Sequence, residues 1–270
     1  MRRKIYAVLA MFLAAFLVCG SLGGMSVSAE GAVQTTTGQW KASGNYYYYY
    51  QDGIKLTGVR QIGANTYYFS QAGKQITGWR KIGGDYYFFN IANGAGGFMV
   101  KNKKVNGIRL GADGKAGLSK KRARNKVKLM AKCATLMDKV TKPGQSKAKK
   151  LKIAFKFAKK HFPRKNIHRW KKSKTWDIYY AQYIINHRAG DCYCQGALMA
   201  YLANAVGYTN VIACSSGRHG WAMIDNKVYD PNWSFIIGDK KCYAVKRSQS
   251  GKGGRPPWFA AAVYKKDLRK

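Results

Sequence analysis

Two cysteines lie two residues apart at the start of a long apolar stretch, and one of them could be a nucleophile. The stretch Arg188–Tyr208 reads RAGDCYCQGALMAYLANAVGY, with Cys192 and Cys194 near its beginning. Asp191 is a good N-cap, so we expect a buried helix that begins at Cys192 and ends at Gly207. The free N–H groups at a helix N-terminus favour a thiolate, the reactive form of cysteine. This position favours Cys192 only slightly over Cys194.

A cysteine nucleophile needs a general base, and His219 is the candidate. It stands at the head of an expected strand in HGWAMIDNKVYDPNW, where a turn at Asp225-Asn226 folds a second strand back on the first. That hairpin brings Asp230 beside His219, where a carboxylate can orient the imidazole and stabilise its charged form. The remaining histidines lie in basic or helical surroundings and are expected at the surface: His161, His168 and His187.

The order and flanks of these residues resemble the transglutaminase-like (papain-fold) cysteine enzymes. That family has G-x-C at the start of its helix, a small residue four places after the cysteine and a glycine fifteen places after it. Counted from Cys192, Gly196 and Gly207 fill these places, whereas the same count from Cys194 fails. The resemblance therefore assigns the nucleophile to Cys192 and leaves Cys194 as a packing or disulfide cysteine.

The family's remaining motifs, H-x-W and D-P, are also present. His219 with Trp221 fills the first, and Asp230 with Pro231 fills the second, within a resemblance that covers about residues 120–235. The resemblance implies acyl transfer, in which Cys192 attacks a carboxamide or peptide carbonyl and forms a thioester. Either water or a lysine amine would resolve that thioester, so a peptidase and a protein-glutamine acyltransferase stay open. No metal and no cofactor are expected.

The oxyanion formed during attack needs hydrogen-bond donors. The backbone N–H of Cys192 is one candidate, and the sequence does not place the second. Three residues are candidates to support the oxyanion or the triad: Gln182, Trp176 and Trp221.

Helices followed by strands must position these residues. Apolar residues recur at helical spacing from Val127 to Met137 and again from Leu151 to Phe162, and TWDIYYAQYIINH predicts a third helix before the cysteine helix. The stretches NVIACSSG, HGWAMID and KVYDPNW predict an antiparallel sheet, with a final strand at Trp258–Tyr264. We therefore expect an α+β fold of the papain-like type for the C-terminal domain.

An internal repeat precedes these elements. Gly38–Thr57 and Gly58–Thr77 repeat with a period of 20, a third unit starts at Gly78, and a degenerate tail runs over Gly97–Gly117. Each unit has a polar strand, a turn and an aromatic strand, which predicts one β-hairpin per repeat. Because a lone hairpin is unstable in water, we expect the hairpins to stack as a solenoid with aromatic side chains between neighbours.

These units resemble the cell-wall-binding (choline-binding type) repeats of Gram-positive surface proteins. The resemblance rests on Gly78-Trp79, the Tyr-Tyr-Phe clusters, the Thr-Gly joins and GADGK at Gly111–Lys115, although Val59 stands where a tryptophan is expected. It implies attachment to choline, teichoic acid or other cell-wall polysaccharide, because aromatic rings bind quaternary ammonium groups and sugars. The expected ligand residues are Trp40, Tyr47, Tyr67, Trp79 and Tyr87.

The start of the chain predicts export. Residues 1–29 combine Arg2, Arg3 and Lys4 with an apolar segment and small residues before Ala29, which is typical of a cleaved signal peptide. After cleavage, no segment is long and apolar enough to cross a membrane. The 49 Lys and Arg outnumber the 11 Asp and Glu, giving a net charge of +38 that attracts polyanions. For an exported protein the expected polyanion is a cell wall and not nucleic acid.

The sequence therefore predicts four segments: the signal peptide over 1–29, the repeat array over 38–117, a basic helical linker over 118–150, and a transglutaminase-like domain over 151–270. The five cysteines after Cys19 are compatible with one nucleophile and two disulfides, or with five free thiols. We expect a secreted, cell-wall-attached cysteine enzyme acting on peptide or glutamine carboxamide bonds. A catalytically inactive wall-binding scaffold and a peptidoglycan endopeptidase remain alternatives.

Overall fold

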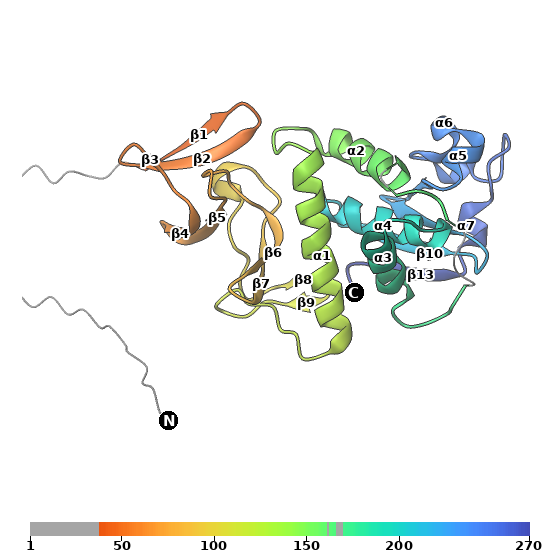
Figure 1. Cartoon of the computed structure of the whole chain (residues 1–270), viewed down its shortest axis with the longest axis horizontal. Coiled ribbons are helices and arrows are strands. Elements are labelled where there is room, and N and C mark those ends of the chain that lie inside the picture. The colour runs from red at the N-terminus through yellow and green to blue at the C-terminus, as the bar shows by residue number, and fades with distance from the viewer. Residues whose placement is uncertain (1–37, 161, 166–169) are drawn as a thin grey trace, which may run out of the picture. The chain divides into compact units, whose positions relative to one another are not determined.

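The computed structural model describes residues 38–160, 162–165 and 170–270. The predicted signal peptide, His161 and His168 lie outside the described residues. Two regions follow each other along the chain (Figure 1): a hairpin array over residues 38–117 and a thiol domain over residues 121–270.

The array consists of successive antiparallel hairpins, as the repeat predicted. The pairs are β1 (Gln39–Ser43) with β2 (Tyr46–Gln51), β4 (Gly58–Ile62) with β5 (Asn65–Phe69), β6 (Gly78–Ile82) with β7 (Asp85–Phe89), and β8 (Lys104–Val105) with β9 (Ile108–Arg109). A short strand β3 (Ile54–Lys55) extends the first hairpin, and a 3₁₀ turn, η1 (Gly94–Gly96), follows the third. The strands that begin at Gly58 and Gly78 confirm the 20-residue period.

Main-chain hydrogen bonds and aromatic contacts tie each hairpin to the next. The bonds run from Gln75 N–H to Tyr47 O (2.8 Å), from Met99 N–H to Thr66 O (2.7 Å) and from Ala116 N–H to Tyr86 O (2.9 Å). The rings of Tyr68 and Phe89, from adjacent hairpins, stack with centroids 5.8 Å apart. A fully buried Phe89 shows why stacking stabilises the array, because a single hairpin could not remove this ring from water.

Four helices open the thiol domain. They are α1 (Lys121–Val140), α2 (Lys147–Lys160), α3 (Trp176–His187) and α4 (Cys192–Ala205). Each lies where the apolar spacing predicted a helix. Within the described residues, no helix is both long and apolar enough to cross a membrane.

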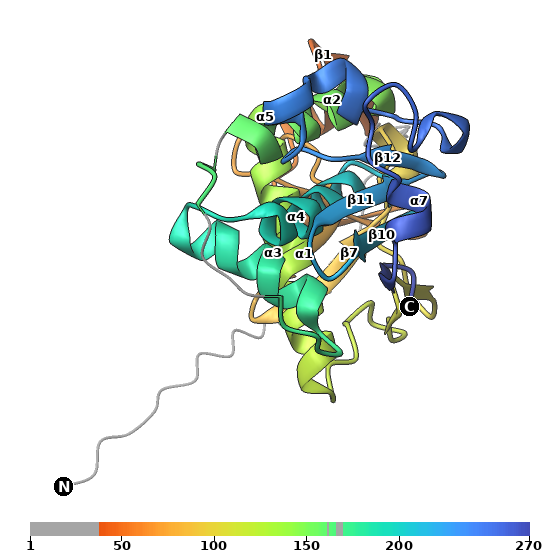
Figure 2. The ribbon, with the colours of Figure 1, turned by 90° about the vertical axis from the view of Figure 1, so that its right-hand side faces the viewer.

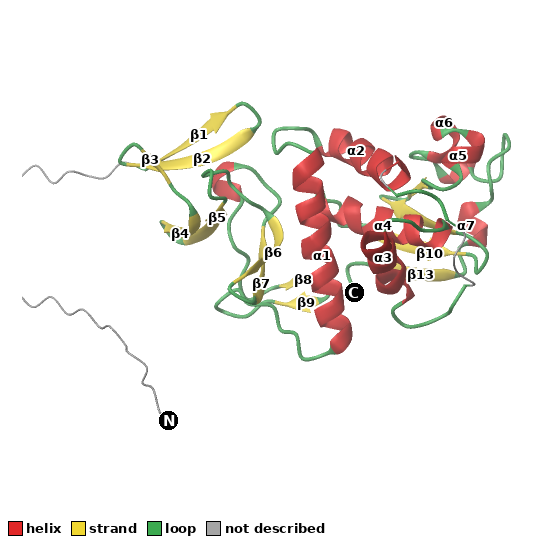
Figure 3. Cartoon of the chain, in the orientation of Figure 1, coloured by secondary structure: helices red, strands yellow, loops and turns green. Residues whose placement is uncertain are grey.

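A four-stranded antiparallel sheet follows the helices (Figures 2 and 3). Its strands are β10 (Val211–Ser215), β11 (Gly220–Ile224), β12 (Lys227–Tyr229) and β13 (Tyr264–Asp267), in the order β12-β11-β10-β13. Asp225 and Asn226 have φ of 45° and 59°, the conformation of a two-residue hairpin turn, and so join β11 to β12 as predicted. Short helical segments lie between β12 and β13: α5 (Ser234–Ile237), α6 (Asp239–Cys242), η2 (Arg247–Gln249) and α7 (Trp258–Ala261).

The final strand differs from its prediction. We expected it over Trp258–Tyr264, but Trp258 begins the helical turn α7 and only Tyr264 of that stretch belongs to β13. The shift has a physical reason, because the indole N–H of Trp258 donates to the buried carboxylate of Asp230. The strand instead forms where Tyr264 to Asp267 pair with β10.

Helix α4 is the centre of the thiol domain. It contacts α1, α2 and α3 as well as β10 and β11, and nearly all its side chains are buried. Two glycines let its backbone approach β11. A Cβ on Gly196 would lie 2.4 Å from the backbone nitrogen of Trp221, and one on Gly220 would lie 2.7 Å from the Cα of Tyr193. This contact brings the start of α4 beside the start of β11.

The segment 118–150, expected as a basic linker, packs instead as part of the thiol domain. Its helix α1 buries Val127, Met130 and Met137 in the same core as α4. The lysines that suggested a linker occupy mainly the exposed face of this helix. The hairpin array also contacts α1, because buried Arg80 forms an ion pair of 2.8 Å with Asp138.

Candidate active site

Cys192 is the first residue of α4 and is half-buried. Asp191 caps the helix as predicted, with its Oδ1 accepting the backbone N–H of Cys194 at 3.1 Å. The first N–H groups of an α-helix have no acceptor within the helix. The Cys192 sulfur therefore lies at the positive end of a buried helix dipole.

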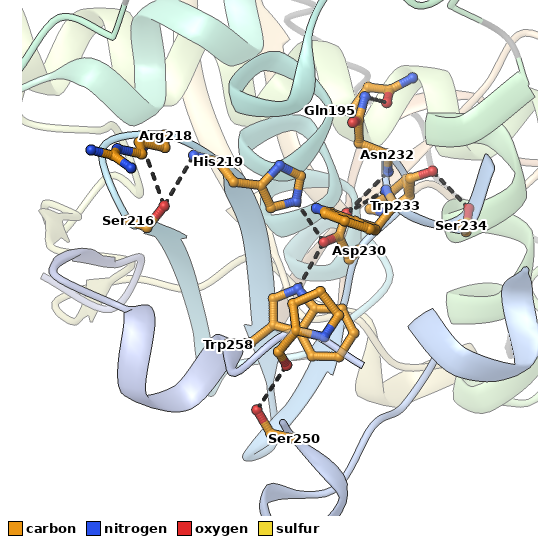
Figure 4. Close-up of polar contacts among 12 residues, drawn as sticks. Gln195, Ser216, Arg218, His219, Asp230, Asn232, Trp233, Ser234, Ser250 and Trp258 are labelled. Carbon is orange, nitrogen blue, oxygen red and sulfur yellow. Dashed lines mark hydrogen bonds and ion pairs between the residues drawn. The ribbon is translucent and has the colours of Figure 1, made fainter. Parts of the chain in front are cut away.

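His219 lies just before β11, with its backbone N–H held by the hydroxyl of Ser216 at 3.0 Å. Its Nε2 is 2.6 Å from Oδ2 of Asp230 (Figure 4), and its side chain is 17% exposed. Cys192 and His219 line the same cleft, and Cys192 is one of the groups that raise the pKa of His219. Since Nε2 faces Asp230, Nδ1 is the ring nitrogen left for the thiol.

The charge state of His219 follows from two opposing effects. Burial lowers the pKa of His219, but the carboxylate of Asp230, by its charge and its hydrogen bond, together with Cys192, raises this pKa to about 9. The imidazole is therefore protonated at neutral pH, and a cation faces the Cys192 sulfur. Such a pairing is the arrangement that activates cysteine nucleophiles.

Asp230 is fully buried, and its carboxylate accepts hydrogen bonds from several groups besides His219. Its Oδ1 accepts the backbone N–H groups of Asn232 (3.1 Å) and Trp233 (2.9 Å). Its Oδ2 accepts the indole N–H of Trp258 at 2.8 Å in addition to His219. Sequence reasoning missed Trp258, because nothing in the chain links it to Asp230 before the fold is known.

A second polar link connects the residues after Asp230 to α4. The side-chain amide of Asn232 donates to Oε1 of Gln195 at 2.9 Å, and Gln195 in turn donates to the backbone oxygen of Phe162 at 3.4 Å. Gln195 is fully buried. Both residues were overlooked, although Asn232 follows the Asp-Pro motif directly. They fix the Asp230 loop relative to the helix that carries Cys192.

Two tryptophans flank the His219 ring. Trp221 stacks on it with centroids 6.0 Å apart, and Trp233 meets it edge-on at 6.0 Å. Trp221 is buried and its indole N–H has no acceptor among the described residues. It packs against the ring of His219.

Gln182 and Trp176, the other support candidates, are not at this site. Gln182 donates to the backbone oxygen of Asn125 at 3.3 Å. Trp176 is buried and packs edge-on against Trp170. Neither lines the cleft that contains Cys192. Their position upstream of the cysteine helix was not enough to place them at the site, because α3 directs these side chains to Asn125 and Trp170 instead.

The other cysteines of the described chain are free and buried: Cys133, Cys194, Cys214 and Cys242. Burial raises the pKa of the Cys194 thiol well above its usual range, with a further contribution from Asp191. Burial also raises the pKa of Cys214 and of Cys242 to about 12. These thiols stay protonated at neutral pH. Cys192 is the one described cysteine that is not buried, and buried Cys194 is a packing residue.

An open cleft of about 450 Å³ contains the reactive groups. Its lining residues are Arg164, Asp191, Cys192, Tyr193, Arg218, His219, Asn232, Trp233 and Ile236. Buried Asp230 lies behind His219 and does not line it. The structure thus brings together all three predicted triad residues and gives the thiol access to solvent.

The candidate ligand residues of the array divide into two groups. Tyr67 and Trp79 are 2% and 3% exposed, and their polar atoms bond to Ala95 O and Asn106 Oδ1. These two side chains are core residues, so their assignment to a wall ligand is corrected. The remaining three keep part of their surface in solvent: Trp40, Tyr47 and Tyr87.

Lysines of the chain lie over tyrosine rings of the first hairpin. The Lys74 ammonium is 3.9 Å from the ring centroid of Tyr46, and the Lys55 ammonium is 4.6 Å from that of Tyr48. These rings therefore already bind cations through their faces.

The array contains repeats of the choline-binding type. Residues 56–103, which include the second and third hairpins, match the choline-binding repeat family. No curated protein matches the chain.

Several solved structures from Streptococcus pneumoniae are similar to part of the chain. They include choline binding protein F in the presence of a peptidoglycan analogue, with 30% identity over 29% of this chain and 25% of that chain and a TM-score of 0.26. The protein CbpJ has 29% identity over 29% and 26% of the two chains, with a TM-score of 0.26. The choline binding domain of Spr1274 has 26% identity over 31% and 98%, with a TM-score of 0.27. The chain thus spans about a quarter of the length of choline binding protein F.

Proposed function

We propose that this protein is an exported, cell-wall-attached cysteine enzyme of the transglutaminase-like type that transfers acyl groups through Cys192, His219 and Asp230. One observation carries the proposal. The accessible thiol at the start of α4 shares one cleft with the His219 imidazole, and Nε2 of this imidazole is 2.6 Å from a buried carboxylate. The same cleft leaves room for a substrate carbonyl beside the sulfur.

In the proposed reaction, the Cys192 sulfur attacks a peptide or carboxamide carbonyl carbon with its proton already held on Nδ1 of the protonated His219. The tetrahedral oxyanion accepts a hydrogen bond from the backbone N–H of Cys192, which has no acceptor within the helix. His219 then returns the proton to the departing amine or ammonia, and a thioester remains on Cys192. Asp230 holds the His219 ring in place throughout.

The second half of the reaction resolves the thioester. His219 takes a proton from the incoming water or amine, the new bond forms at the carbonyl carbon, and the Cys192 thiol is released with that proton. Water gives a peptidase or deamidase, whereas a lysine amine gives a crosslinking acyltransferase. Both outcomes use the same three residues, so the proposed activity includes both.

The hairpin array supplies attachment in this proposal. The choline-binding type of its repeats and the half-buried rings of Trp40, Tyr47 and Tyr87 support binding of a quaternary ammonium group or a sugar of the wall. The excess of basic residues would strengthen contact with anionic wall polymers, and this part of the attachment weakens with salt.

The test is the rate of iodoacetamide alkylation at each cysteine at about pH 6, measured by mass spectrometry on the folded protein. An ordinary thiol, with a pKa of about 8.5, reacts slowly there. We expect Cys192 alone to be labelled quickly and His219→Ala to slow this by roughly 100-fold. The buried cysteines serve as internal controls in the same sample. Slow labelling of Cys192 in both proteins would favour the alternative of an inactive wall-binding scaffold.

A further inference from the structure

Two arginines line the cleft that contains the Cys192 thiol. Arg164 precedes the cysteine helix and Arg218 is adjacent to His219, and both side chains are exposed. In the part of the chain that the structure describes, neither guanidinium has an ion-pair or side-chain hydrogen-bond partner. The chain has 35 Lys and only 14 Arg, so two arginines and no lysine at the cleft are a departure from its overall composition.

The backbones of both arginines are fixed to the catalytic elements. The segment of Arg164 pairs with Gly190, through Gly190 N–H to Pro163 O (3.1 Å) and Lys165 N–H to Gly190 O (2.9 Å). The Arg218 backbone N–H is held by Ser216 at 3.2 Å (Figure 4). Each guanidinium is therefore attached to a fixed point beside the nucleophile or its base.

No acidic side chain of the described cleft neutralises these cations from an exposed position. Asp191 is 4% exposed and its Oδ1 already accepts the N–H of Cys194. Asp230 is fully buried against His219 and Trp258. Two guanidinium groups and His219, whose charge is paired with Asp230, line the same cleft as Cys192. Trp233 and Ile236, the latter 58% exposed, add an apolar wall.

We propose that Arg164 and Arg218 select an acidic acyl donor, a peptide with a carboxylate close to the carbonyl that Cys192 attacks. An arginine fork binds a carboxylate through two parallel hydrogen bonds, which fixes position as well as charge. Ile236 and Trp233 then contact the apolar part of the same peptide. This inference rests on the proposed function, since it assigns specificity to the same nucleophile.

The first test compares an anionic and a neutral reagent at Cys192. The rates of alkylation by iodoacetate and by iodoacetamide are measured on the full chain. The ratio of the iodoacetate rate to the iodoacetamide rate is then compared between wild type, Arg164→Gln, Arg218→Gln and the double variant. We expect each single substitution to lower the ratio by about threefold and the double substitution by about tenfold. Arg218→Lys keeps the charge and should keep most of the ratio. Arg109→Gln, an exposed arginine of the array, is the matched control.

The ratio separates this inference from the proposed function. If iodoacetamide labels Cys192 quickly but the ratio is unchanged in the double variant, the arginines do not select anions and only the inference fails. If iodoacetamide itself is slow, the proposed nucleophile fails first. A fall in the ratio of wild type at 1 M salt, absent in the double variant, would support the electrostatic origin.

The second test uses peptides. Acetyl-Glu-Gln-Glu-amide and acetyl-Gln-Gln-Gln-amide are compared as competitors that protect Cys192 from iodoacetamide. We expect the acidic peptide to protect at lower concentration, and expect this advantage to disappear in the double variant. Equal protection by both peptides in wild type would overturn the proposal.

Discussion

The hairpin array and the thiol domain differ in whether a repeated local pattern accounts for their main contacts. In the array, each hairpin closes within about a dozen residues, and the next unit repeats the pattern 20 residues later. In the thiol domain, His219 is oriented by Asp230, and Asp230 accepts a hydrogen bond from Trp258, which is 28 residues further on. Local patterns therefore describe the array, whereas tertiary packing assembles the thiol site.

The largest expected effect tests the packing of α4 on β11. In Gly196→Val, a Cβ would lie 2.4 Å from the Trp221 nitrogen, so the helix and strand must separate. We expect a loss of roughly 3 kcal/mol or more in the free energy of unfolding, measured by denaturant titration.

Gly117→Ala in the array is the matched control, because its added Cβ would meet only Arg109 O at 3.5 Å. This substitution should change stability by about 0.5 kcal/mol or less. A similar cost for the two glycines would contradict the view that the close approach of α4 to β11 requires glycine at position 196.

The next effect concerns the pH dependence of stability. The pKa of His219 is raised to about 9 in the folded protein from about 6.5 when unfolded. The stabilisation of the fold by protonated His219 and its partners is therefore complete below pH 6.5 and disappears as pH rises through 9. We expect the stability difference between wild type and His219→Gln to shrink by up to about 3 kcal/mol across this window. Urea unfolding at a series of pH values measures it.

The stability of wild type must be compared with that of His219→Gln, because a second group, Lys126, changes stability with pH in the opposite direction. Burial lowers the pKa of Lys126 to about 8, so its contribution to stability increases above that pH. Lys126 is common to both proteins, and its effect cancels in the difference. A pH-independent difference would show that Asp230 does not hold a charged His219.

Trp258→Phe tests the positioning residue that sequence reasoning missed. It removes the N–H that donates to Asp230 Oδ2 but keeps an aromatic ring in the buried site. We expect a cost of about 2 kcal/mol in stability and roughly tenfold slower alkylation of Cys192 at pH 6. With this donor gone, Asp230 pairs more strongly with His219, so the NMR titration of His219 should move to higher pH. An unmoved titration would mean that Trp258 acts by packing alone.

The smallest expected effect concerns the array. Lys74→Gln removes the ammonium that lies 3.9 Å from the Tyr46 ring and frees that ring face. If this ring binds a wall cation, affinity for choline should increase by a few-fold, which corresponds to about 0.5–1 kcal/mol. Calorimetry compares it with Lys81→Gln, an exposed lysine of β6. Equal affinities in the two variants would exclude Tyr46 as a ligand group.

The sequence predicted the elements better than their contacts. Helix α4, its cap at Asp191 and the turn at Asp225-Asn226 were found, because cap and turn residues act on their own neighbours. The α+β order of elements and the hairpin repeat were found for the same reason. The alternation of aromatic residues in the array did not reveal which rings are buried, and Tyr67 and Trp79 were misassigned.

The supporting residues of the thiol site show the same limit. Gln182 and Trp176 were proposed from position alone, whereas Trp258, Gln195 and Asn232 make the contacts. Each of these contacts joins segments that only the folded chain brings together. A motif specifies the triad, but the residues that orient it depend on the packing of a particular chain.

The most direct test of the central claim is the pH dependence of iodoacetamide alkylation at Cys192. A working pair with His219 predicts a rate that stays high and nearly constant from about pH 6 to 8, because the imidazolium keeps the sulfur reactive. In His219→Ala the rate should instead fall about tenfold per pH unit below about 8.5, as for an ordinary thiol. If wild type follows this second profile as well, Cys192 and His219 do not act together and the proposed enzyme activity is contradicted.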